Sequence, residues 1–460
     1  MNQQDKVKHL YSRAGFGIHY SEYQKLKNQR IEKLVDRMFS ESAKYRPLSV
    51  VEEPKQDVPY GTLTAEERRQ RQREYSEQTR TLNVAFLDKL ASDDAFLREK
   101  MTLFFHGHFA CRQQNAPFYI QELNNIHRDY ALGNFKALTV AVSQSRAMLS
   151  FLNNQQNRKG KPNENFAREL MELFTLGVGH YTEDDIKASA RAFTGWRYNK
   201  NSKFEFAEKL HDDGVKTFFG KKGRFNGQDI IDMIFEKKQT AYYISGKLYR
   251  FFVNETPNEA HIKELGDYFY SKNYELKPVL KKMFTADWFY DDVNVGNKIK
   301  TPIEFIAGLN RQFYIDYENK GVLLRFQQAL GQTLFYPPNV SGWPLGKDFI
   351  DSSSLMLRLK MPSTILNNGI LEVEGKADPD DEAILAFARR ESKKVAQRIK
   401  ASADWDKFSK NLPEKLDKKD LAAFLLRAPI SPALLSNVSE STDLKTKVVQ
   451  LLSTPEYQMC

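Results

Sequence analysis

The chain has 460 residues, of which 41% are hydrophobic and 12% aromatic, enough apolar side chain to exclude global disorder and to build one large domain or two or three smaller ones. Its 69 Lys and Arg outnumber its 59 Asp and Glu and leave a net charge of +10, a mild excess that predicts a basic, soluble surface more readily than a dedicated nucleic-acid face. The two cysteines, Cys111 and Cys460, exclude a disulfide framework and a zinc site of the CxxC type.

The start of the sequence, MNQQDKVKHLYSRAGFG, lacks the apolar run that follows the basic start of a secretory signal. No run of about 18 apolar residues occurs anywhere, so no membrane-spanning helix is expected. The expected location is therefore the cytoplasm, and export stays open for a chain whose start has been trimmed.

Helical patterns fill the first 200 residues. Residues 1–45 predict two short helices around a Gly-Phe-Gly turn, and the Pro-containing stretch 46–61 predicts a loop. Thr64 and Glu67 have the spacing of a capping box and open a long helix, whose charged first half should project into solvent or across a partner. The apolar segment AFLREKMTLFFHGHFAC comes next, and further helices are predicted at about 118–132, 134–152, 164–176 and 183–196.

This helical rhythm is interrupted once. Phe204 and Phe206 alternate with charged residues, a turn follows around Asp213 and Gly214, and VKTFFG completes a β-hairpin expected near 204–219. Helices then resume, and the Pro- and Gly-rich loop 335–351 interrupts them again. The helices predicted in this half are 228–253, 257–272, 276–286, 301–315, 321–333 and 352–367.

The pattern as a whole predicts a mainly α fold without a repeat of fixed period. We expect one large multi-helix domain over residues 1–370, into which the small hairpin is inserted. A linker at 371–381, LEVEGKADPDD, and a basic helical C-terminal region at 382–460 follow.

The most organised stretch is PNENFARELMELFTLGVGHYTEDDIKASARAFTGW, residues 162–196. Its second helix should be capped by the Thr182 hydroxyl on the amide of Asp185. The buried face of its first helix is predicted from the spacing of Phe166, Leu170, Leu173 and Phe174. The stripe beside that face contains Asn165, Glu169 and Glu172.

Two readings of this stripe remain open. Two carboxylates three residues apart at the edge of a core, such as Glu169 and Glu172, can share a proton or a cation. They can also be a solvated shoulder, because Arg168 has i,i+4 spacing to both Glu164 and Glu172. Glu169 has no cation four residues away, so we expect it to be mostly buried and to contact an Arg, a His or a metal from elsewhere in the chain.

Histidines supply the other candidates. In FFHGHFA, His106 and His108 are two residues apart, which points them to opposite sides of a helix unless Gly107 ends it. His211 and Asp212 head the predicted hairpin turn, a position that suits local turn geometry and also the display of a site. The site predictions are a catalytic set of Glu169, Glu172, His211 and Asp212, and a divalent metal held by His108, Glu169 and Asp212.

Five segments carry a resemblance to a known family: HLYSRAGFG, LREKMTLFFHGHFA, the central motif from NENFAREL to AFTGW, HDDGVKTFFG, and PPNVSGWPLGKDFIDSSSLMLR. Over residues 9–358 the chain resembles the bacterial domain of unknown function 1800 family. The resemblance implies a largely helical protein, often accompanied by a companion protein with a phosphatase- or sulfatase-like fold, and relatives of which many are exported. It implies no catalytic residues. The Asn and Trp variants frequent in the family around HGHF make His108 a better match than His106.

Three functions fit these observations. The first is a helical binding or scaffold protein that acts with a partner protein. The second is a metal-assisted, hydrolase-like enzyme that uses His108, Glu169, Glu172, His211 and Asp212, for which these five side chains have to converge. The third is a weak polyanion binder, since specific nucleic-acid binding is not expected from so mild a charge excess.

Overall fold

A computed structural model describes residues 1–54, 62–92, 94–112, 116–368, 399–410, 412–413, 416–438 and 443–460. Helices dominate this part of the chain and the strands form only small two-stranded antiparallel sheets, so the predicted mainly α fold is confirmed. The predicted linker 371–381 lies outside the described residues, as do residues 382–398 of the predicted C-terminal region. Within the described ranges, no helix is both long and apolar enough to cross a membrane.

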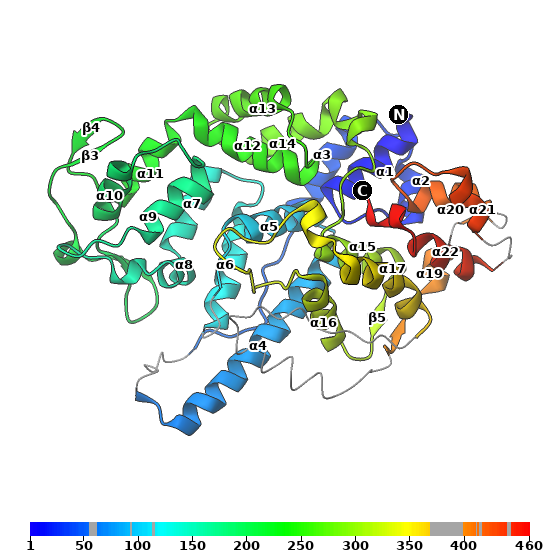
Figure 1. Cartoon of the computed structure of the whole chain (residues 1–460), viewed down its shortest axis with the longest axis horizontal. Coiled ribbons are helices and arrows are strands. Elements are labelled where there is room, and N and C mark those ends of the chain that lie inside the picture. The colour runs from blue at the N-terminus through cyan, green and yellow to red at the C-terminus, as the bar shows by residue number, and fades with distance from the viewer. Residues whose placement is uncertain are drawn as a thin grey trace.

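The helices follow one another with short connections, and Figure 1 shows them around a central α5. Two predicted helices are each split, 134–152 by the N-cap Ser145 and 228–253 by the residues between α11 and α12. The helices up to the first strand are α1 (Gln3–Ala14), α2 (Tyr20–Leu26), α3 (Ile31–Ser42), α4 (Ala65–Ser92), α5 (Phe96–His108), α6 (Pro117–Tyr130), α7 (Phe135–Gln144), α8 (Arg146–Phe151), α9 (Asn165–Glu169) and α10 (Glu183–Ala192). Those after the fourth strand are α11 (Gly227–Phe235), α12 (Lys238–Phe252), α13 (Glu259–Ser271), α14 (Leu276–Thr285), α15 (Pro302–Phe313), α16 (Gly321–Leu330), α17 (Ser352–Leu366), α19 (Trp405–Ser409), α20 (Lys418–Leu425), α21 (Pro432–Asn437) and α22 (Leu444–Leu452).

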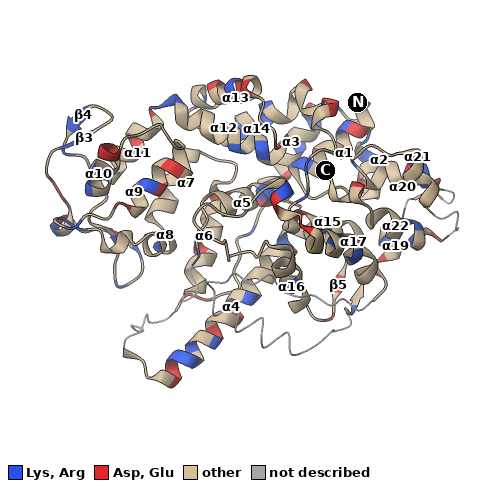
Figure 2. Ribbon diagram, viewed as in Figure 1, with Lys and Arg blue, Asp and Glu red and all other residues tan. Residues whose placement is uncertain are grey.

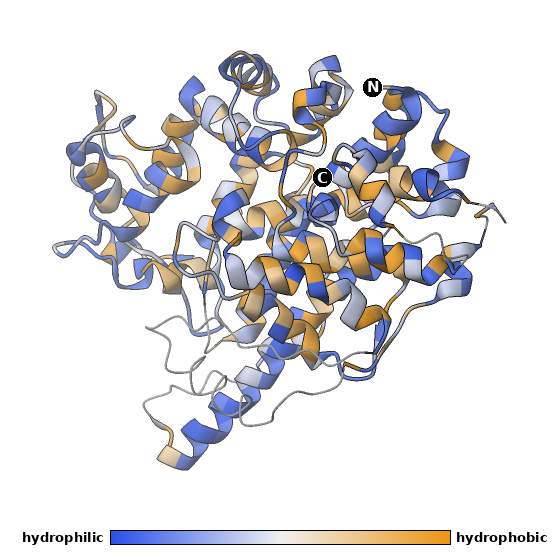
Figure 3. Ribbon diagram, turned by 45° about the vertical axis from the view of Figure 1, so that its right-hand side comes forward, coloured by the Kyte–Doolittle hydropathy of each residue, from blue (hydrophilic) through white to orange (hydrophobic). Residues whose placement is uncertain are grey.

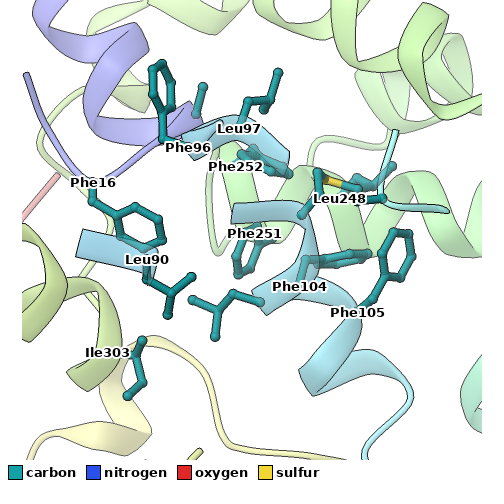
Figure 4. Close-up of a cluster of buried hydrophobic side chains, with 14 of the residues drawn as sticks. Phe16, Leu90, Phe96, Leu97, Phe104, Phe105, Leu248, Phe251, Phe252 and Ile303 are labelled. Carbon is teal, nitrogen blue, oxygen red and sulfur yellow. The ribbon is translucent and has the colours of Figure 1, made fainter. Parts of the chain in front are cut away.

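Helix α5 is buried on all sides, and every one of its residues except Gly107 is buried. Its charged side chains are satisfied inside the protein, since Arg98 donates to the Arg128 carbonyl, Glu99 accepts from the Arg128 guanidinium and Lys100 donates to Glu304. Phe104 packs edge-on against Phe251 of α12 with ring centroids 5.2 Å apart. Figure 4 shows this contact within a larger cluster of Phe and Leu side chains.

Helix α4 has two different halves, as its composition predicts. The capping box forms, with the Thr64 amide donating to the Glu67 carboxylate at 2.7 Å and the Glu67 amide donating to the Thr64 hydroxyl at 3.3 Å. Residues 65–78 contain no buried side chain, and burial begins at Thr79. At 1.5 Å per residue, about 20 Å of helix projects from the body, and this half is hydrophilic in Figure 3.

The β structure differs from the predicted single hairpin. Strand β2 (Phe204–Phe206) pairs with the preceding β1 (Trp196–Tyr198), and β3 (Lys216–Phe218) pairs with the following β4 (Lys221–Gly223). The β3–β4 loop is Phe219-Gly220, with φ of 49° and 78°, the pair of positive φ values that a two-residue type I′ turn requires. The predicted pairing of 204–206 with 215–219 is therefore wrong, and the HDDG segment connects two hairpins.

The C-terminal residues pack on the rest of the chain. Strand β5 (Asp316–Tyr317) pairs with β6 (Ala401–Ser402), and α22 packs against α17. The Cys460 amide donates to the Lys298 carbonyl at 2.8 Å. Apolar side chains of α20 and α22 belong to the same hydrophobic core as those of α1 and α5, so residues from both ends of the chain meet in one core (Figure 1).

Candidate functional site

Three of the five segments that carry the family resemblance, the HGH segment, the central motif and the loop 335–351, meet at the C-terminal end of α5. His106 accepts a hydrogen bond from the Phe335 amide at 3.0 Å and lies 5.3 Å from the Trp343 ring, centroid to centroid. Gly342 has a φ of 86°, and a side chain there would collide with the carbonyl oxygen of Gly107. The loop 335–351 is thus seated directly on the HGH segment, and His106 is a buried acceptor for that loop.

His108 faces the other way, toward residues 170–175. Its Nε2 lies 3.1 Å from the Phe174 carbonyl, and its Nδ1 lies 3.4 Å from Nζ of Lys247. Because a carbonyl only accepts, Nε2 carries the proton and Nδ1 is the acceptor. Burial, followed by the charge of Lys247, holds the pKa of His108 well below its usual value, so the ring is neutral. Both nitrogens are used by the protein, and the two histidines point in opposite directions as their spacing predicts.

Helix α9 continues directly into a π-helix, Leu170–Thr175. The wider turn leaves the carbonyls of Leu173 and Phe174 for partners outside the helix. The Leu173 carbonyl accepts from Lys247 Nζ at 3.0 Å and from the Tyr243 hydroxyl at 3.1 Å, and that of Phe174 faces His108. The extra residue in the turn also changes the buried face, which includes Met171 whereas Leu173 is only partly buried. π-helical turns of this kind are frequent at functional sites.

Two carboxylates lie at the start of this π-helix, Glu169 directly before it and Glu172 in its first turn. Glu172 accepts a hydrogen bond from the Tyr181 hydroxyl at 2.7 Å. Glu169 is partly buried and makes no hydrogen bond or ion pair with the described residues. Burial, and then the charge of Glu172, raise the pKa of Glu169. We call these residues the π-helix site: Glu169, Glu172, Tyr181, Lys247 and His108.

The prediction that Glu169 is mostly buried is therefore wrong, since its side chain is only partly buried, and it makes no ion pair with an Arg or a His among the described residues. The nearby cations have other partners. Arg168 pairs with Glu164 at 3.3 Å, as predicted, but its second partner is Glu183 at 2.9 Å, whereas Glu172 is bonded to Tyr181. The ammonium of Lys247 points at backbone carbonyl and imidazole groups instead of a carboxylate.

His211 and Asp212 belong to a separate network. The Asp212 carboxylate makes two hydrogen bonds with the Arg191 guanidinium, at 2.7 and 3.2 Å, which hold the pKa of Asp212 at about 2. The Asp212 amide donates to the Thr194 hydroxyl at 2.7 Å, and His211 Nδ1 lies 2.9 Å from the Thr194 carbonyl. These contacts fasten the connection between the hairpins to the end of α10.

The predicted metal set is not assembled. No three His, Cys, Asp or Glu side chains among the described residues lie together in a way that could hold a metal ion. His108 is engaged with the π-helix and Asp212 with Arg191, so neither is available to join Glu169. The five side chains of the metal-assisted hypothesis divide between the π-helix site and the α10 network.

Asp212→Asn is expected to lower the free energy of unfolding by about 1 kcal/mol at pH 7, after allowance for the partial exposure of the pair. The folded pKa of Asp212 lies below the unfolded value near 4, so its stabilisation is complete above about pH 4 and is lost as the pH falls toward 2. Urea unfolding at pH 7 and pH 3 measures both effects. Asp213→Asn, which removes an exposed pair with Lys159, is the control, and equal losses in the two variants would contradict the assignment.

Sequence reasoning missed Lys247, Tyr243 and Tyr181. Burial, and then the charge of Arg250, lower the pKa of Lys247 to about 8. The sequence contained a signal for the burial of Lys247, because this residue lies three positions after Ile244 and four before Phe251 on the apolar stripe of its helix. A lysine on such a stripe has to find acceptors inside the protein.

Comparison with known proteins gives one match. A family model described as "Protein of unknown function (DUF1800)" matches residues 9–459, nearly the whole chain. No curated protein and no solved structure matches the chain.

Proposed function

We propose that this chain, which belongs to the DUF1800 family, is a helical binding protein that acts with a partner protein and receives a cationic side chain of that partner at Glu169 and Glu172. The observation that carries the proposal is a pair of partly buried carboxylates, neither of which makes an ion pair with the described residues. Removal of a carboxylate from bulk water without a cation is unfavourable. An ammonium or guanidinium group supplied by a partner relieves this penalty and the repulsion between the two carboxylates.

The loop after the π-helix adds an apolar contact beside these charges. Val178 is 74% exposed. Gly177 and Gly179 on either side of it have φ of 84° and 86°, and a side chain at Gly177 would lie 2.9 Å from the Tyr243 ring. Glycines are therefore suited to hold this valine at the tip of the loop. The surface fits a partner segment in which a Lys or Arg is flanked by an apolar residue.

The companion protein that the family resemblance implies, with its phosphatase- or sulfatase-like fold, is the partner to test first. The other two predicted functions are supported by fewer observations. The metal-assisted reaction needs ligands that here lie in separate networks. Polyanion binding is favoured by a continuous basic face, whereas the projecting half of α4 contains Glu as well as Arg side chains (Figure 2).

The double substitution Glu169→Gln, Glu172→Gln is expected to weaken binding of the companion protein about tenfold or more at low salt, because glutamine keeps the shape and removes the charge. Isothermal titration of the purified proteins measures the affinity. Binding by the wild type should also weaken as acid protonates Glu169, and this weakening should begin at a higher pH than for an ordinary glutamate because the pKa of Glu169 is raised.

The matched control is Glu259→Gln, which removes an exposed carboxylate in the first turn of α13 and should bind as the wild type does. Val178→Ser tests the apolar contribution without a change of charge. Unchanged affinity in the double variant contradicts the site. Failure of the wild type to bind the companion contradicts this choice of partner.

A further inference from the structure

A second feature, distant in sequence from the π-helix site, is a cavity of about 50 Å³ beside the Gly15–Gly17 turn. It lies where this turn, α5, α15 and the C-terminal residues meet (Figure 1). Glycine suits position 17 of this turn because its φ is 102°. The Gly17 amide donates to the Tyr11 carbonyl at 3.2 Å. A volume of this size holds about four water molecules, or one small oxyanion.

The charged side chains that line the cavity are mostly cationic. Lys8, Lys100, Lys300 and Arg427 line it, against Glu304 and the negative charge at Cys460. Phe16, Phe424 and Tyr457 contribute aromatic rings to the wall. The Lys100 ammonium lies 4.7 Å from the centroid of Phe16, one of the rings labelled in Figure 4.

Glu304 is already fully used. Lys100 Nζ donates to its Oε1 at 2.6 Å, and Lys298 Nζ donates to its Oε2 at 2.8 Å. Lys8 pairs with Asp5 at 2.8 Å. Lys300 and Arg427, by contrast, make no ion pair with the described residues and donate to backbone carbonyls, Lys300 to that of Tyr457 at 2.7 Å.

Two arginines behind these residues add to the excess of positive charge. Arg13 and Arg358 are at most 1% exposed. Nη1 of Arg13 and Nη2 of Arg358 have no hydrogen-bond partner among the described residues. Buried guanidinium nitrogens without an acceptor are unusual in folded proteins, and their presence here indicates that the region has room for further negative charge.

We propose that this cavity binds a phosphate group, either as the free ion or as the end of a larger molecule. Lys300 and Arg427 are its direct ligands, because both line the cavity and neither makes an ion pair with a carboxylate of the described residues. The planar guanidinium of Arg427 and the flexible ammonium of Lys300 together offer donors in several directions, which suits a tetrahedral oxyanion. Ser12, Gly17 and Gln312 are partly exposed lining residues, so the cavity opens to solvent on their side.

Protonation of Lys300 supplies an independent readout. The pKa of Lys300 is lowered to about 8, mainly by burial. The negative charges at Cys460 and Glu304 oppose this effect, and the positive charges of Arg427 and Arg358 add to it. An anion bound next to the ammonium favours its charged form. Phosphate binding at pH 8.5 should therefore be accompanied by proton uptake at Lys300.

The experiment is isothermal titration of the full chain with inorganic phosphate and with glycerol phosphate in 0.15 M chloride. Lys300→Met is expected to weaken binding about tenfold or more and to abolish proton uptake, measured in two pH 8.5 buffers of different ionisation enthalpy. The control Lys25→Met removes an exposed lysine on α2 and should leave both quantities unchanged. Circular dichroism verifies that both variants are folded.

Tighter binding of inorganic phosphate supports a free anion as the ligand, and tighter binding of glycerol phosphate supports a phosphate ester. The proposal is overturned if the wild type binds neither at millimolar concentration, or if Lys300→Met and Lys25→Met bind equally well.

Discussion

Replacement of Glu304 by glutamine is expected to lower the free energy of unfolding by about 3–5 kcal/mol, because it leaves two buried ammonium groups without their carboxylate. Glu304 is 5% exposed, and the side chains of Lys100 and Lys298 are 2% and 4% exposed. Burial alone raises the pKa of Glu304, yet the two lysines override it and hold the pKa well below its usual range. The stabilisation should therefore be complete above about pH 5 and be lost progressively as the pH falls from the unfolded pKa of about 4.5 toward that depressed value.

The chain contains a matched control for this substitution. Thr301 and Glu304 form a capping box at the start of α15, and Thr64 and Glu67 form the same box at the start of α4. Glu67 is exposed and has no buried lysine beside it. Glu67→Gln should thus cause a much smaller loss in urea unfolding, and equal losses in the two variants would show that capping, and not the buried lysines, determines the effect.

Replacement of Lys300 by methionine is expected to raise the free energy of unfolding by about 2 kcal/mol at pH 7. Its pKa is about 8 in the folded chain and near 10.5 when unfolded, a difference worth about 3 kcal/mol. Loss of its hydrogen bond to Tyr457 offsets about 1 kcal/mol. Charged Lys300 is disfavoured by the folded state, so methionine removes this penalty while filling similar space.

The stability gain from Lys300→Met should depend on pH, because Lys300 loses its proton at a lower pH in the folded chain than in the unfolded chain. Below about pH 8 the amine is charged in both states and the penalty is complete, so the gain from methionine is largest there. Between pH 8 and 10.5 the folded amine is neutral while the unfolded one still binds a proton, so wild-type stability rises and the gain shrinks. Unfolding curves at pH 7 and pH 10 measure it, with Lys25→Met as the control. A gain that is independent of pH contradicts the burial of the Lys300 charge.

Glu304 and its lysine partners illustrate why contacts between buried charges are hard to predict from sequence. Glu304 is readable as a capping residue, since Thr301 precedes it by three positions. Of its two lysines, Lys298 precedes it by six residues, whereas Lys100 lies 204 residues away in the sequence. Nothing in the local pattern distinguishes Lys100 from an exposed lysine, because its contact with Glu304 depends on how α5 and the start of α15 meet in the fold.

The π-helix site was half predictable for a similar reason. The spacing of Glu169 and Glu172 placed both at the edge of the core, where the structure has them. The π-helix that begins at Leu170 was not predictable, since the carbonyls near its end are bonded to Lys247 and Tyr243 from α12 and to His108 from α5. Whether these carboxylates form a site remains the prediction tested by the glutamine variants.

By itself, the sequence determined the local features, which depend on residues only a few positions apart. These include the capping boxes at Thr64 and Thr182, the Arg168–Glu164 pair, and the opposite directions of His106 and His108. Tertiary structure alone decided the partner of Phe204–Phe206, the second partner of Arg168 and the contact of Lys100 with Glu304. The physical reason is that a local hydrogen bond or helical face is dictated by the backbone geometry of one turn. A strand edge or a buried charge, by contrast, accepts any suitable partner, and the one it meets depends on how distant elements pack.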